Sequence, residues 1–215
     1  MASLTYGSLG PVKGKVGNLI VSSWKGKPYV KSLPAERKSP PTEKELNNRM
    51  KWTLAHAWLK PVTKFVREGF KGYTPTVEGF LAAKSYVLKN AFEGMAPDLT
   101  INPALVKVSF GELPLPENIQ ATLQGNDTVQ FTWSTEDITR TNRYDQVMLL
   151  EYDIENRYSI KTLTGQLRYT GVDTLQLSVV RGQVYHLYVA FVSADRSMQS
   201  DSIYLGAVNV KPEKE

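Results

Sequence analysis

The stretch GQVYHLYVAFVSADRSMQSDS, residues 182–202, decides the fold of the C-terminal half of this 215-residue chain. Large apolar side chains occupy every second position from Tyr185 to Phe191. A period of two is that of a β-strand, whose successive side chains point to opposite faces of a sheet. Gly182 and residues 194–200 provide turn residues at its two ends. The sequence therefore predicts a strand that turns one face toward a hydrophobic core.

Seven further runs after Pro97 are rich in strand-forming residues and are separated by turn residues. The eight predicted strands are 105–110, 119–123, 129–133, 146–152, 158–163, 174–179, 185–192 and 203–210. Short strands at this spacing are typical of an antiparallel sandwich or barrel. We therefore expect residues 113–215 to form an antiparallel β-sandwich that follows a connecting strand or linker, residues 98–112.

Residues 40–97 have a helical period instead. Pro40-Pro41 prevents an upstream helix from continuing, and Thr42 with Glu45 matches a capping box, which starts a new one. We expect this helix to run from residue 43 to about residue 59. Its predicted apolar face consists of Leu46, Met50, Thr53, Leu54, Ala57 and Trp58.

Two more helices are expected before the change of period. Pro61 suits the first turn of a second helix, which Gly69 and Gly72 end. Apolar residues from Phe80 to Phe92 recur at helical spacing, and Gly94 and Pro97 close this third helix.

The N-terminal segment predicts a basic β-hairpin. Residues 19–21 and 29–30 are strand formers, and the turn is expected at 25–27, where Gly26 can adopt a positive φ. The glycines before residue 18 indicate an extended arm over about the first 15 residues. Together these patterns predict an α+β multidomain fold, in which 1–97 holds the arm, the hairpin and about three helices.

Charge is distributed unevenly along the chain. Residues 1–97 contain 16 Lys and Arg against 6 Asp and Glu, a net charge of +10, whereas residues 98–215 contain 10 against 15, a net charge of −5. Such asymmetry indicates a basic half that meets an acidic partner, or two complementary faces on one molecule. It is also compatible with two halves that each solvate their own surface.

Composition excludes several chemistries. The chain has no cysteine, so disulfides, thiolate metal sites and cysteine nucleophiles are ruled out. The N-terminus does not resemble a secretory signal, and no apolar run reaches the ~20 residues that span a bilayer. We expect a cytoplasmic chain.

No arrangement of polar residues identifies a catalytic or metal site. His56 and His186 fall in unrelated predicted elements, and no phosphate loop or serine elbow is present. Glu136, Asp137 and Asp145 lie in one predicted loop, but the spacing of a calcium loop is missing. We therefore expect no enzyme activity, no cofactor and no metal.

A cluster of cations and aromatic residues marks the predicted hairpin as the candidate contact. Its members are Lys13, Lys15, Trp24, Lys25, Lys27, Tyr29, Lys31, Arg37 and Lys38. Lysines can hold phosphates and aromatic faces can stack on unpaired bases, which would make the hairpin a nucleic-acid clamp. Alternatively, the aromatic residues pack against the helices while the lysines line a solvated face.

Two resemblances accompany these patterns. Residues 114–210 resemble a fibronectin type III module: Pro116, the run TVQFTW that ends at Trp133, and Tyr185 after Gly182 in the place of a tyrosine corner. Such modules hold partners or space domains. The whole chain is similar to an uncharacterised family of proteins of this length that is common in Bacteroidota, through GKVGN (14–18), SWKGKPYVKSLP (23–34), PPTEKELNNRMKW (40–52) and FLAAKSYVLKNAFEGMAPD (80–98).

The sequence thus favours a non-enzymatic structural or adaptor protein, which docks to copies of itself or to a larger assembly such as a virion or another particle. Nucleic-acid binding through the same hairpin is the alternative. A second alternative is carbohydrate binding through exposed aromatic residues of the β region, namely Tyr144, Tyr158 and Tyr169.

Overall fold

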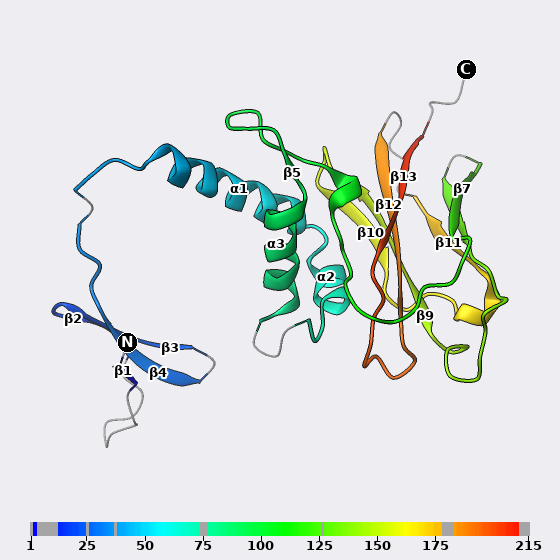
Figure 1. Cartoon of the computed structure of the whole chain (residues 1–215), viewed down its shortest axis with the longest axis horizontal. Coiled ribbons are helices and arrows are strands. Elements are labelled where there is room, and N and C mark those ends of the chain that lie inside the picture. Colours follow the sequence, from blue (N-terminus) through cyan, green and yellow to red (C-terminus); the bar gives the residue numbers. More distant parts are fainter. Residues whose placement is uncertain are drawn as a thin grey trace. The chain divides into compact units, whose positions relative to one another are not determined.

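A computed structural model describes residues 2–3, 13–24, 26–36, 38–73, 77–125, 127–177 and 183–210. The chain separates into two compact units, Met1–Thr42 and Glu43–Glu215, which we call the N-terminal unit and the C-terminal unit (Figure 1). Each unit is considered by itself. Among the described residues, no helix has both the length and the apolar character that a membrane crossing requires.

The N-terminal unit is a four-stranded antiparallel sheet in the order β1-β4-β3-β2. Its strands are β1 (Ala2–Ser3), β2 (Gly14–Val16), β3 (Leu19–Trp24) and β4 (Lys27–Ser32). The hairpin of β3 and β4 confirms the prediction, and Gly26 in its turn has a φ of 78°. The expected extended arm is wrong in part, because β1 and β2 pair with the hairpin. Gly17, with a φ of 57°, allows the chain to reverse between β2 and β3.

Three helices open the C-terminal unit, as predicted. They are α1 (Glu43–Leu59), α2 (Thr63–Gly69) and α3 (Gly79–Asn90). The expected end of the third helix is too late: Phe92 belongs to a short strand, β5 (Phe92–Glu93), which pairs with β6 (Thr100–Ile101). Phe92 has the spacing of the helical pattern, but its backbone pairs with that of Ile101, so the helix ends before it.

The buried face of α1 differs from the prediction. Ala55, Trp58 and Leu59 are buried, whereas Thr53 is exposed and Leu46 is half-exposed. The burial of Trp58 confirms one member of the predicted face. Only the C-terminal part of α1 rests on the core, so its inner face consists of residues 55, 58 and 59. The apolar residues near its start were assigned to a face that the core does not reach.

The β region consists of two antiparallel sheets. One has the order β11-β8-β7 and the other β10-β9-β12-β13. The strands are β7 (Gln120–Gln124), β8 (Thr128–Thr132), β9 (Gln146–Asp153), β10 (Tyr158–Thr162), β11 (Val172–Gln176), β12 (Val184–Val192) and β13 (Ile203–Asn209). Side chains from both sheets, including Phe131, Leu149 and Phe191, share one core. The C-terminal unit is therefore α+β, with a β-rich part of seven main strands among the described residues.

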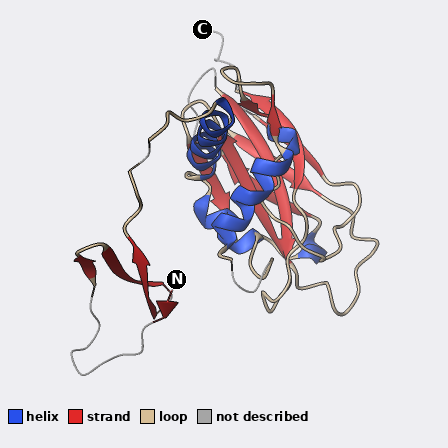
Figure 2. Ribbon diagram, turned by 60° about the vertical axis from the view of Figure 1, so that its left-hand side comes forward, coloured by secondary structure: helices blue, strands red, loops and turns tan. Residues whose placement is uncertain are grey.

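The sheet β10-β9-β12-β13 is covered on both faces. The helices lie on one face, and the sheet β11-β8-β7 lies on the other (Figure 2). Along β9, Leu149 points to the sheet β11-β8-β7, whereas Met148 and Leu150 pack with the helices. This is the alternation that strand geometry requires. The helices and the β region thus share a core within one unit.

The segment 105–110 is not a strand, contrary to the prediction. A short 3₁₀ helix, η1 (Pro103–Leu105), is followed by irregular chain. The amide of Phe110 donates to the carbonyl of Gly69 at 2.8 Å, and the amide of Val108 donates to Ser202 Oγ at 2.9 Å. The backbone groups of this segment are satisfied by α2 and by the loop before β13, so no ladder partner is needed.

Candidate functional site

The strand register gives the N-terminal sheet two different faces. In an antiparallel pair, directly opposed residues share a face, and side chains alternate along each strand. Trp24 pairs with Lys27, Ser22 with Tyr29, and Ile20 with both Lys31 and Lys15. One face, here called the basic face, therefore carries Lys15, Ile20, Ser22, Trp24, Lys27, Tyr29 and Lys31.

The opposite face of this sheet has no charged side chain among the described residues. Leu19 pairs with Val16, Val21 pairs with Val30, and Ser23 pairs with Pro28. We call this surface the apolar face; it consists of Val16, Leu19, Val21, Ser23, Pro28, Val30 and Ser32. One sheet thus presents an apolar surface and a cationic, aromatic surface on opposite sides.

In the N-terminal unit, none of residues 13–24, 26–36 and 38–42 is buried. Trp24 is 62% exposed, Val16 59% and Leu19 48%. A small sheet requires a covered hydrophobic face to be stable, and contiguous exposed apolar surface marks interaction sites. The composition of both faces therefore fits a sheet that is covered by another surface.

Five of the nine residues expected to form the contact lie together on the basic face: Lys15, Trp24, Lys27, Tyr29 and Lys31. Lys13 and Lys38 are exposed and lie outside the four strands. Lys25 and Arg37 lie outside the described residues. That these side chains bind a partner stays a prediction, but the register shows that a shared face is available to them.

The polar residues weighed for chemistry are dispersed. Asp145 is buried against Arg168, with 3.5 Å between Oδ2 and Nη1, and burial raises the pKa of its carboxyl despite that cation. His186 Nδ1 lies 2.8 Å from the hydroxyl of Tyr204, and burial lowers the pKa of its ring. Within the described ranges, no group of three metal-ligating side chains comes together.

The three tyrosines considered for carbohydrate binding do not form one platform. The guanidinium of Arg143 lies 5.1 Å from the ring centre of Tyr144 and 5.7 Å from that of Tyr169. Tyr158 begins β10 and pairs with Asp153, whereas Tyr144 precedes β9. Because β9 separates these positions, only Tyr144 and Tyr169 are neighbours.

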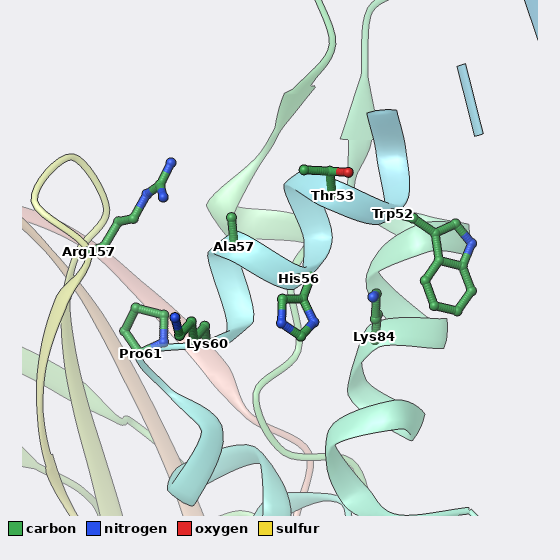
Figure 3. A pocket seen from close by; sticks show the side chains of 8 residues that line it. All are labelled: Trp52, Thr53, His56, Ala57, Lys60, Pro61, Lys84 and Arg157. Atoms are coloured by element: carbon green, nitrogen blue, oxygen red, sulfur yellow. The ribbon is translucent and has the colours of Figure 1, made fainter. Parts of the chain in front are cut away.

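Sequence reasoning missed a cleft in the C-terminal unit. Its volume is about 800 Å³, and it is lined by Trp52, Thr53, His56, Ala57, Lys60, Pro61, Lys84 and Arg157 (Figure 3). Lys84 comes from α3 and Arg157 from the turn between β9 and β10, and they lie on either side of His56 in this view. Residues more than 100 positions apart in the chain thus meet at one surface.

Lys84 is the least exposed cation of the cleft, at 6%. Its ammonium group lies 4.0 Å from the ring centre of Trp52, and burial lowers its pKa. A signal for it exists in the sequence, because Lys84 follows Phe80 by four positions and precedes Val87 by three. It therefore occupies a position on the apolar stripe of α3.

The family model described as "Family of unknown function (DUF6266)" matches residues 11–206, and the chain belongs to this family. The expectation of an uncharacterised family of about this length is confirmed. No curated protein matches the sequence.

Proposed function

We propose that this member of a family of unknown function is a non-enzymatic docking protein, whose N-terminal sheet binds the acidic surface of a second copy of the chain. The observation that carries the proposal is that no described residue of β2, β3 or β4 is buried, although the two faces of the sheet are sharply different in composition. Docking supplies a covering surface that the described residues of the unit do not provide.

Charge complementarity favours a second copy as the partner. The N-terminal unit contains seven Lys and Arg and one Glu, a net charge of +6, and the C-terminal unit contains 19 Lys and Arg and 20 Asp and Glu, a net charge of −1. The acidic excess of the C-terminal unit lies in residues 98–215, where 10 Lys and Arg stand against 15 Asp and Glu, a net charge of −5. Glu112, Glu117 and Glu136 are among the exposed acidic residues of that half. Contacts between two different surfaces of identical chains build rings or filaments. A particle such as a virion is one setting for such an assembly, and the cytoplasm is the proposed location.

We infer a fibronectin type III-like arrangement for the β region, which would act as a spacer. The three-plus-four strand order supports this inference. So do the buried Trp133 after β8 and the buried Tyr185 at the start of β12. The hydroxyl of Tyr185 donates to Gln183 Oε1 at 3.0 Å. Gly182 lies outside the described residues.

Single-stranded nucleic acid is a second candidate partner. Trp24 and Tyr29 share the basic face with Lys15, Lys27 and Lys31, so ring faces and ammonium groups are presented together. Stacking on aromatic side chains combined with phosphate contacts is the usual mode of sequence-independent binding to single strands.

Light scattering after size exclusion, with absorbance at 260 and 280 nm and at low and high salt, tests the proposal. Docking between copies predicts defined oligomers that are free of nucleic acid and dissociate as salt increases. A monomer that carries polynucleotide at low salt and releases it at high salt would instead establish the second candidate. A monomer that carries nothing at either salt concentration contradicts both.

A further inference from the structure

The cleft of α1, α3 and the β9–β10 turn is lined by three basic side chains. Lys60 follows α1, Lys84 lies on α3 and Arg157 lies in the turn. None of the described residues that line the cleft is acidic. A concave surface that is lined by cations and by no carboxylate has a positive potential, which favours the approach of an anion.

Lys84 makes the strongest case for an anion. Among the described residues, it forms no hydrogen bond or ion pair, and its ammonium group lies over the ring of Trp52. Partial burial lowers the pKa of this ammonium group, and its nitrogen still has accessible surface, so an anion can approach it. An oxyanion in the cleft would supply both the charge and the acceptor that Lys84 lacks.

Apolar groups form the remainder of the cleft wall. Trp52 is 53% exposed, and Ala57 and Pro61 lie beside the cations. The volume of about 800 Å³ is in the range of small-molecule sites. The cleft therefore has room for an organic group in addition to the anion, and an apolar wall on which that group can rest.

An adjoining cavity adds further apolar lining. It measures about 300 Å³ and shares Ala57 and Arg157 with the cleft. Leu54, Ile101 and Ile154 are among its other lining residues, so it offers more apolar surface to the organic part of a ligand.

We propose that this cleft binds a small organic phosphate monoester. Lys60, Lys84 and Arg157 line the cleft from different parts of the chain, and this excess of positive charge favours a dianion over a singly charged carboxylate. The phosphate oxygens accept hydrogen bonds from the ammonium and guanidinium groups, and the guanidinium of Arg157 suits bidentate phosphate recognition. The organic part of the ligand lies against Trp52, Ala57 and Pro61.

Titration of the full chain with phenyl phosphate, followed by calorimetry and by tryptophan fluorescence, tests this site. We expect saturable binding, weaker binding of inorganic phosphate, and no measurable binding of phenol, which lacks the anion. Lys84→Met retains an apolar stem and should weaken binding about 10-fold or more. Lys89→Met, on the exposed side of the same helix, is the matched control and should bind as the parent does.

A second variant keeps the test valid if Lys84→Met unfolds the chain. Arg157 is exposed and has a φ of 54°, a conformation that Asn tolerates, so Arg157→Asn should fold and bind about 10-fold more weakly. The proposal is overturned if the parent does not bind phenyl phosphate saturably, or if Arg157→Asn binds it as tightly as the parent. Equal affinity for phenol or for inorganic phosphate would also contradict a monoester site.

Discussion

The hydroxyl of Tyr152 donates a hydrogen bond of 2.8 Å to the carbonyl of Trp58, and the two rings meet edge to face with 4.8 Å between their centres. Tyr152 lies on β9 and Trp58 on α1, so this pair joins the sheet to the helical layer. Both side chains are buried in the core that the two layers share.

Tyr152→Phe should therefore lower the free energy of unfolding by about 1 kcal/mol, the usual net contribution of a buried hydrogen bond. The ring contact with Trp58 is retained in this variant. Urea unfolding of the full chain measures the effect. Tyr158→Phe, which removes the hydroxyl of a half-exposed tyrosine, is the control and should leave stability unchanged.

Glu151 should make stability depend on pH. It is 1% exposed, neither carboxylate oxygen has a hydrogen-bond partner among the described residues, and burial, with the charge of Asp153, raises its pKa from 4.5 to about 8. Between these two values the folded chain holds a proton that the unfolded chain has lost. The contribution of this group is thus fully present below about pH 4.5 and is lost as the pH rises toward 8.

Glu151→Gln should remove this loss. For a single group, the slope is at most about 1.4 kcal/mol per pH unit. Denaturant unfolding of the parent and the variant at several pH values from 5 to 9 measures it, the range being chosen to bracket the pKa of about 8. The curves should diverge as the pH rises, with Glu151→Gln the more stable. Parallel curves would show that Glu151 is not the group responsible.

Gly69 at the end of α2 should not tolerate a side chain. A Cβ built there would lie 2.8 Å from Ser109 Cα, and the amide of Phe110 bonds to the Gly69 carbonyl. Because the obstacle is backbone, Gly69→Ala should destabilise the chain by about 1–3 kcal/mol. Thermal unfolding checks this, with Ser85→Ala on the exposed side of α3 as control. An unchanged melting temperature would mean that segment 106–110 is not packed against α2.

Local signals predicted much of the secondary structure. The bounds of α1 follow from Pro40-Pro41 and the helical period, and β12 follows from strict alternation after residue 183. Segment 105–110 was mispredicted as a strand. Val106 and Val108 are both buried, but they lie in irregular chain, and alternation of apolar residues in the sequence does not distinguish such a segment from a strand. Pairing of β1 with β4 depends on contacts distant in sequence, for which no local signal exists.

The two candidate sites also differ in how far the sequence predicts them. The cations and aromatic residues of the hairpin form a visible cluster in the sequence. That several of them share one face follows from the strand register, which depends on the length of the turns. The cleft joins α1, α3 and the β9–β10 turn, so it exists only in the fold. Only Lys84 on an apolar stripe was a readable sign of it.

The most direct test of the docking proposal is light scattering of the full chain over a range of concentrations, with Lys27→Glu and Lys31→Glu combined to invert two charges of the basic face. We expect oligomers that grow with concentration in the parent and a monomer in the double variant. Lys44→Glu with Lys89→Glu changes the same charge on exposed positions of α1 and α3 and should assemble as the parent does. A monomeric parent, or equal dissociation of the two double variants, would contradict docking through the basic face.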